Sequence, residues 1–248
     1  MKRIFTAMLS LAILATLSVG AHAQSPSRDQ VLKEIAAKRA ELQQLEDQFL
    51  SPAAEDRAAY KELLSQPDTG LIRLLPREIY ESETYKKNQK TLTIRGAGAF
   101  YSFARLTHEY GYGSDLMLDS EYLSVGFAGA CYGMMIDLGD VPVHEITADY
   151  PGVGALSDYA AAKDEPEARV EQRQVQLGRI LDGVPYKARV PVRIGTTFLL
   201  RSINYDFSDV LVAFRVVRKD TDGSVIIAWK LLKRFPKPEL VRAVQAAN

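Results

Sequence analysis

The residues of this chain that could do chemistry gather in the stretch 107–115, THEYGYGSD. Tyr110 and Tyr112 each offer a broad apolar ring with a hydroxyl group, which suits stacking on a sugar or a peptide. His108 and Asp115 would be the polar partners of such a ligand. The glycines permit left-handed backbone, so the stretch is expected to be the tip of a hairpin. The simpler interpretation is a plain turn in which one tyrosine packs back onto the sheet.

Imidazole chemistry would have to use His108 or His144, because the third histidine lies in a segment that is expected to be removed. Neighbouring residues on a strand point to opposite faces, so neither histidine can share an ion with the glutamate that follows it. A zinc site would need both histidines brought together with Asp115. The patterns HExxH, paired CxxC and GxSxG are absent. We therefore predict no catalytic or metal-binding residues, with a metal-dependent or serine hydrolase as the alternative.

A second candidate site consists of three cations in the middle of predicted strands, Arg201, Arg215 and Lys230. If all three side chains lay on one face of a sheet, they could bind an anion. Whether they do depends on the strand register, which the sequence leaves open. The alternative is that each is solvated. Elsewhere, Gly96-Ala97-Gly98 lacks the third glycine of a dinucleotide-binding loop, so no cofactor is predicted.

The elements that must position these residues are most evident in the last third of the chain. Residues 196–205, 210–218 and 224–232 alternate apolar and polar side chains and are rich in β-branched residues, which predicts three strands in a meander. Asp222-Gly223 lies between the second and third strands, and Gly223 suits the left-handed position of a hairpin.

Further strands are predicted upstream, at 91–106, 116–138 and 141–147. The glycines in the first two indicate bulges or close approach of another backbone. Residues 122–135 could instead form a buried helix, since periodicity does not decide for that segment. Residues 151–163 are typical of a loop, and 165–181 of one inserted helix. Pro191, within the strand predicted at 188–194, cannot donate to a sheet ladder and therefore indicates an edge strand.

The amino-terminal part is predicted to be helical. Apolar residues recur at helical spacing between positions 28 and 49, and Ser51-Pro52 supplies the start of a second helix that reaches residue 65. Together, residues 24–66 are expected to form a helical hairpin, followed by a connector at 67–90. The apolar seam, interrupted by Lys38, could make a coiled coil and a homo-oligomer, or it could pack on the protein's own β domain.

The first 23 residues have the features of a secretory signal peptide. Lys2 and Arg3 precede an apolar run from 4 to 20, and Ala21-His22-Ala23 offers small residues around a cleavage point. An uncleaved membrane anchor is the alternative. An exported protein with one cysteine cannot form an internal disulfide, and the apolar surroundings of Cys131 predict a small buried side chain.

The chain carries 31 basic and 31 acidic residues, a balance that gives no electrostatic reason to expect a nucleic-acid partner. The predicted fold is mainly β with N-terminal helices: residues 91–248 form an antiparallel β-sandwich or partly open β-barrel. The predicted function is an exported, periplasmic or secreted, non-catalytic binding or structural module of the cell envelope. It would recognise a protein or glycan partner and would not span the membrane. A carrier of an apolar ligand in a barrel cavity remains an alternative.

Overall fold

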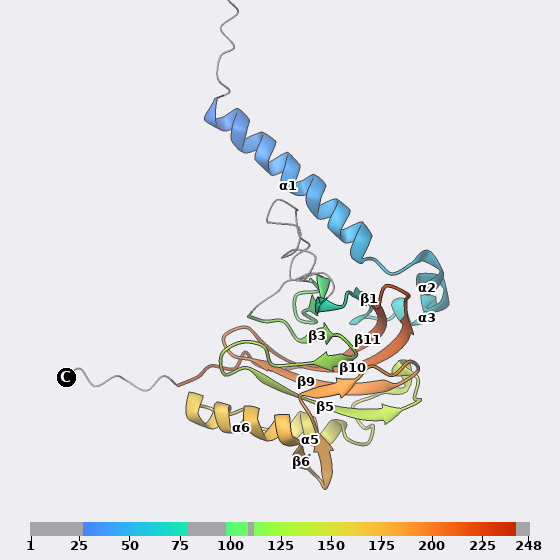
Figure 1. Ribbon diagram of the computed structural model, residues 1–248. Helices are drawn as coiled ribbons and strands as arrows, with labels where there is room; N and C mark the ends of the chain where they lie inside the picture. The colour runs from blue at the N-terminus through green and yellow to red at the C-terminus, as the bar shows by residue number, and fades with distance from the viewer. Residues whose placement is uncertain (1–26, 79–97, 109–111, 242–248) are drawn as a thin grey trace, which may run out of the picture. The chain divides into compact units, whose positions relative to one another are not determined.

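A computed structural model describes residues 27–78, 98–108 and 112–241 and shows a mainly β fold of antiparallel sheets (Figure 1). The predicted fold class is thereby confirmed, and neither of the main sheets closes into a barrel. The chain divides into two compact units, residues 1–44 and 45–248. The candidate sites and the sheets lie in the second unit.

The amino-terminal helices occur where the sequence predicts them. Helix α1 spans Arg28–Leu50. The second predicted helix is divided into α2, Ala54–Ala59, and α3, Lys61–Leu64, because Tyr60 between them leaves the helical region with φ −105° and ψ 19°. Within the first unit, the seam residues Val31 and Ile35 are exposed. The hairpin arrangement and the coiled coil stay predictions.

The larger sheet has five strands in the order β1-β11-β10-β9-β5. Its strands are β1 Thr69–Leu74, β5 Tyr132–Gly139, β9 Thr197–Asn204, β10 Ser208–Lys219 and β11 Val225–Arg234. The last three form the predicted meander, and Gly223 between β10 and β11 has φ 83°. Strand β1 corrects the interpretation of 67–90 as a connector. This short segment pairs with β11 at the edge of the sheet, and its alternate residues Ile72 and Leu74 are buried.

The smaller sheet has four strands in the order β2-β3-β4-β8. These are β2 Phe100–Tyr101, β3 Leu116–Asp119, β4 Tyr122–Ser124 and β8 Arg189–Pro191. Pro191 lies on the edge strand β8, as its missing N–H predicts. A separate hairpin consists of β6 Arg179–Leu181 and β7 Val184–Tyr186.

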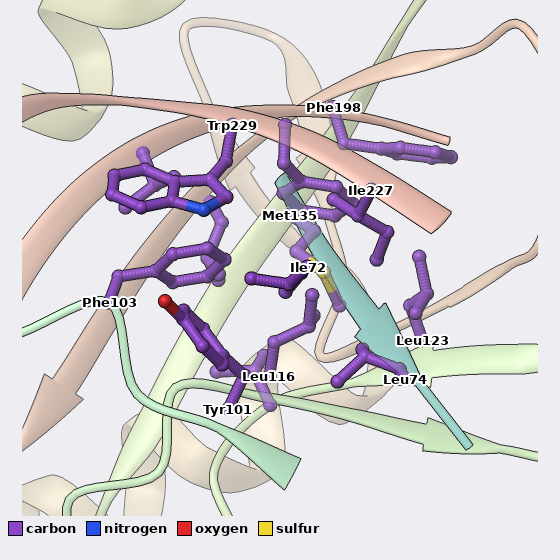
Figure 2. Packing of buried hydrophobic residues seen from close by; sticks show 14 of the residues in the cluster. Ile72, Leu74, Tyr101, Phe103, Leu116, Leu123, Met135, Phe198, Ile227 and Trp229 are labelled. Carbon is purple, nitrogen blue, oxygen red and sulfur yellow. The ribbon is translucent and has the colours of Figure 1, made fainter. Parts of the chain in front are cut away.

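The two main sheets pack face to face around an apolar core, which makes the fold a sandwich (Figure 2). Figure 2 shows Tyr101, Leu116 and Leu123 of the smaller sheet against Phe198 and Trp229 of the larger one. Phe103 from the loop after β2 contacts Trp229 edge to face, with ring centroids 5.5 Å apart. This alternation of inward-facing residues is the period-two pattern of the sequence.

The opposite face of the five-stranded sheet is covered by helices, α5 Val153–Asp158 and α6 Glu165–Leu177 (Figure 1). Val153 and Leu156 of α5 are buried in one cluster with Val175 of α6 and with Leu199 and Leu211 of the sheet. The sheet is therefore buried on both faces, by a second sheet on one side and by helices on the other.

Several predicted boundaries need correction. The strand predicted at 116–138 is interrupted: it becomes β3, β4 and β5, with a left-handed Gly126 (φ 81°) in the turn between the last two. The helical alternative for 122–135 is wrong, since the segment holds strands and turns. Gly133 lies in β5, where a Cβ would overlap the Val125 side chain and lie 2.7 Å from the Arg201 carbonyl oxygen, so close packing of a side chain and of a neighbouring backbone explains that glycine.

Three other segments differ from the prediction. The expected strand at 141–147 is a short 3₁₀ helix, η2 Val143–Glu145, which Pro142 precedes, and the expected loop at 151–163 contains α5. Helix α6 stops at Leu177 because Gly178 adopts a left-handed conformation (φ 109°), and residues 179–181 enter β6. The strands predicted at 91–106 lie partly outside the described residues; only β2 is seen there.

Among the described residues, no helix combines the length and the apolar character that a membrane crossing requires.

Candidate functional site

The stretch 107–115 belongs to the connection between β2 and β3, two strands that pair antiparallel. It is therefore part of a hairpin loop, as predicted. Tyr110 lies outside the described residues. The other three predicted site residues of this stretch, His108, Tyr112 and Asp115, are described and have different environments. The loop divides into a buried part and an exposed part.

Asp115 is completely buried and holds the loop to the sheet. One carboxylate oxygen accepts hydrogen bonds from the backbone N–H of Phe103 at 2.7 Å and from the hydroxyl of Ser102 at 3.2 Å. The other accepts from the side-chain amide of Asn204 at 2.8 Å. Burial raises the pKa of Asp115 to about 6, and hydrogen bonds from Ser202 and Phe103 oppose this rise. The residue is therefore a structural acceptor with no surface for a ligand.

His108 is also engaged internally. Its Nε2 lies 2.8 Å from the backbone carbonyl oxygen of Arg73, and its ring meets Tyr101 edge to face at 5.1 Å. Burial lowers the pKa of His108, so the neutral ring donating from Nε2 is the form that fits the Arg73 carbonyl. The imidazole thus ties the loop to strand β1.

The zinc arrangement considered from the sequence is not formed. His144 lies in η2, where its backbone carbonyl accepts from Lys230, while His108 and Asp115 are committed to the contacts above. Within the described residues no group of three or more His, Cys, Asp or Glu side chains could hold a metal ion.

The exposed part of the loop carries an aromatic pair. Tyr112 stacks on Phe207, which comes from the turn between β9 and β10, with ring centroids 5.8 Å apart and planes 17° apart. The two rings are 60% and 44% exposed, respectively. The guanidinium of Arg105 lies 5.1 Å from the Phe207 ring centroid and donates to the Tyr112 carbonyl oxygen at 3.1 Å. Tyr112 and Phe207 form what we call the aromatic pair.

The aromatic pair lines a cleft of about 1380 Å³. Residues 128–131 line it as well, and the start of α6 contributes Asp164, Glu165 and Arg169. Arg169 donates to the carbonyl oxygen of Gly129 at 2.5 Å and pairs with Glu165 at 3.1 Å, so it joins these two segments. A cleft of this size, with apolar rings and a few polar groups, is large enough for several rings of a ligand.

The second predicted site has a mixed outcome. The register pairs Arg201 with Leu211 and Lys230 with Ala213, and Arg215 lies two residues beyond Ala213. Cross-strand partners share a face, so all three cations do point to the helix-covered side. Each has its own partner, however: Arg215 pairs with Asp140 at 2.5 Å, and Lys230 donates to His144. The three cations therefore do not build one anion site.

Arg201 is the most deeply buried of these cations and is bound from several directions. It forms a two-point ion pair with Asp209, Nε to Oδ1 at 3.0 Å and Nη2 to Oδ2 at 2.8 Å. Its Nη1 donates to the carbonyl oxygens of Leu156 and Tyr159, at the end of α5. The guanidinium carbon also lies 3.7 Å from the Phe235 ring centroid. This residue joins sheet and helix layer, and its environment leaves no room for a ligand.

Cys131 is buried, as its apolar surroundings predict, and burial raises the pKa of its thiol. A thiol with a raised pKa is a poor nucleophile at neutral pH. Cys131 lines the cleft, but its thiol does not supply a nucleophile there.

Sequence reasoning missed Phe207, the partner of Tyr112, and the neighbouring Arg105. One signal was present: the connection 206–207 is short, and an aromatic residue in such a turn, where small polar residues are the rule, cannot reach the core. The proximity of Phe207 to Tyr112 could not be predicted, because it arises only from the tertiary fold.

Comparison with known proteins adds no assignment, since the chain matches no family model, no curated protein and no solved structure.

Proposed function

We propose that the protein is an exported, non-catalytic binding module of the cell envelope that recognises a glycan through the cleft beside Tyr112 and Phe207. The observation that carries the proposal is the aromatic pair, two exposed and stacked rings at the wall of a cleft of about 1380 Å³. Large apolar side chains are costly to expose, and their grouping beside a concave surface is typical of a ligand site.

The contacts of the loop favour binding over catalysis. His108 and Asp115, the side chains best suited to acid–base work, are held inside by Arg73 and Asn204 and are directed away from the cleft surface. The cleft is lined by the two rings and by Asp164, Glu165 and Asp206. Asp164 accepts from the Glu167 N–H at the start of α6, and Glu165 is paired with Arg169, so these two carboxylates have structural partners. They do not supply an activated nucleophile paired with a base.

The packing of the sandwich disfavours a carrier of an apolar ligand. Such a carrier needs an open interior, and the space between the two sheets holds the rings of Phe103, Phe198 and Trp229 together with Met135 (Figure 2). Export is supported by the basic, apolar and small-residue segments of the first 23 positions.

The proposal is tested by titrating the purified chain with an array of neutral and acidic oligosaccharides and measuring affinity by calorimetry. We expect at least one oligosaccharide to bind. Because a ring contact contributes about 1–2 kcal/mol at the centre of a binding site, Tyr112→Ala and Phe207→Ala should each weaken binding about tenfold. Their melting temperatures should stay near that of the wild type, since both rings are exposed.

Tyr122→Ala is the matched control. Tyr122 is also an exposed tyrosine beside an arginine, with its ring centroid 4.0 Å from the Arg189 guanidinium, but it lies on β4 and outside the cleft. Its removal should leave affinity unchanged. The proposal fails if no oligosaccharide binds, or if the Tyr122 variant loses as much affinity as the Tyr112 variant.

A further inference from the structure

A smaller pocket of about 270 Å³ adjoins the aromatic pair and is lined by cations. It lies between the loop after β2, the β9–β10 turn and the segment that follows β11. Arg105, Arg234 and Lys237 line it, together with Phe207, which also lines the larger cleft. The two cavities thus share one aromatic side chain.

The residues that line this pocket include three cations and one carboxylate, whereas the carboxylates of Asp164, Glu165 and Asp206 line the larger cleft. Its own carboxylate, Asp209, is buried and neutralised by Arg201 through two hydrogen bonds. Arg234 reaches Asp68 only at 4.0 Å, and Lys237 reaches Glu239 at 3.4 Å. These two pairs are solvent-exposed, and exposed pairs contribute little, so an incoming anion can replace them at small cost.

The pocket also contains hydrogen-bonding groups that an oxyanion could use. Within the described residues, the Ser208 hydroxyl is buried and has no hydrogen-bond partner, although it lines the pocket. Arg234, which also lines the pocket, donates a hydrogen bond from Nη1 to the Ala104 carbonyl oxygen at 3.3 Å. An acidic group entering here would meet at least two cations.

We propose that the ligand of the aromatic pair is an acidic carbohydrate, whose ring contacts Tyr112 and Phe207 and whose carboxylate or sulfate group enters the pocket lined by Arg105, Arg234 and Lys237. This inference rests on the proposed function and adds the chemical class of the ligand to it. The shared Phe207 and the position of Arg105 beside that ring make stacking and charge recognition parts of one continuous surface.

The test compares three probes on the full chain by calorimetry: an oligogalacturonate hexamer, a heparin-derived hexasaccharide and neutral cellohexaose. We expect an acidic probe to bind about tenfold more tightly than the neutral one at low salt, with affinity falling as salt rises. Oligogalacturonate carries carboxylates alone, whereas the heparin hexasaccharide carries both carboxylates and sulfates. Tight binding of both probes therefore indicates recognition of a carboxylate, and tight binding of the heparin probe alone indicates recognition of a sulfate. The double variant Arg234→Gln/Lys237→Gln should lose that tenfold preference while its affinity for cellohexaose stays the same.

The control is the double variant Arg189→Gln/Arg193→Gln, which removes two cations from the region of edge strand β8, at Asp119 and Asp137, and changes the net charge equally. It should retain the preference for acidic probes. Equal binding of acidic and neutral probes by the wild type, or equal losses in both double variants, would overturn the inference.

Failure of the inference and failure of the proposed function give different results. If Tyr112→Ala weakens all probes but the Arg234/Lys237 variant changes none, the aromatic site stands and the acidic preference falls. If the Arg234/Lys237 variant alone abolishes binding, while Tyr112→Ala and Phe207→Ala do not weaken it, the cationic pocket stands and the aromatic site falls.

Discussion

Two buried aspartates, one on each face of the five-stranded sheet, are stabilised in opposite ways. Asp115 contacts Ser202 and Asn204 on the sandwich face of β9, and its recorded donors are neutral amides and hydroxyls. Asp209 lies on the helix-covered face, where a cross-strand guanidinium, Arg201, binds both of its oxygens. Both carboxylates are removed from water to a similar extent.

The difference shows that burial alone does not determine how a carboxylate affects stability. Desolvation raises the pKa of both groups, and at Asp209 the Arg201 charge counteracts that rise. On the sandwich face the neutral donors leave a carboxyl whose pKa is about 6. On the sandwich face, stability therefore depends on the protonation of the Asp115 carboxyl group. On the helix-covered face, it depends on the presence of both Arg201 and Asp209.

The largest effect is expected from breaking the ion pair. Arg201→Met leaves Asp209 buried without its cation and removes the donors to Leu156 and Tyr159, which should lower the free energy of unfolding by about 3–5 kcal/mol. Urea denaturation followed by tryptophan fluorescence measures this loss.

The double variant Arg201→Met/Asp209→Leu sharpens the comparison. Replacing both members of a buried pair with apolar residues removes the uncompensated charge, so at least half of the loss should be recovered. A double variant as unstable as Arg201→Met would show that the lost carbonyl contacts, and not the buried charge, dominate on this face.

A smaller effect is expected from pH at Asp115. In the folded protein this group binds a proton below about pH 6, whereas in the unfolded chain it does so only below about 3.9. Between these values the folded state holds more protons, so stability should rise as pH falls from 7.5 to 4.5, by roughly 2 kcal/mol for this group. Denaturation midpoints across this range measure the change.

His108 opposes this trend and must be removed from the measurement. Its pKa is lowered in the folded protein, so below about pH 6.5 the unfolded chain binds a proton that the folded ring does not, and stability falls. The comparison therefore uses His108→Gln, whose amide can still donate to the Arg73 carbonyl, against His108→Gln/Asp115→Asn. Parallel pH profiles of these two variants would contradict an elevated pKa at Asp115.

The sequence predicts the strands of the meander because residues on one face, such as Val212 and Phe214, recur at every second position and the turns contain Gly or Asp. It does not predict β1, since the pattern of Leu71, Ile72 and Leu74 is too short to distinguish a strand from an apolar connector. The pairing of β1 with β11, whose paired residues lie 151 to 161 positions apart, is a tertiary effect.

The candidate site was predicted in part. Residue types marked the loop 107–115 as special, but they did not indicate that Asp115 and His108 face inward and Tyr112 outward. That division is set by contacts with Asn204 and Arg73, which lie on distant strands. Likewise, the sequence contains both Arg201 and Asp209 but does not predict that they form an ion pair, because that contact depends on the register of the β9–β10 hairpin.

The smallest effect is expected from removing one neutral donor at Asp115. Ser102→Ala deletes the hydroxyl 3.2 Å from the carboxylate and leaves the Phe103 N–H and the Asn204 amide in place. A single hydrogen bond contributes about 1 kcal/mol, so the variant should lose that amount at pH 7.5 and less at pH 4.5, where the carboxyl is protonated. Because the hydroxyl favours the charged form, carbon-13 titration of Asp115 should show a pKa above that of the wild type. A loss of stability that is the same at both pH values would mean that the Ser102 hydroxyl acts through the loop backbone, where it also accepts from the Arg105 N–H, and not through the carboxylate.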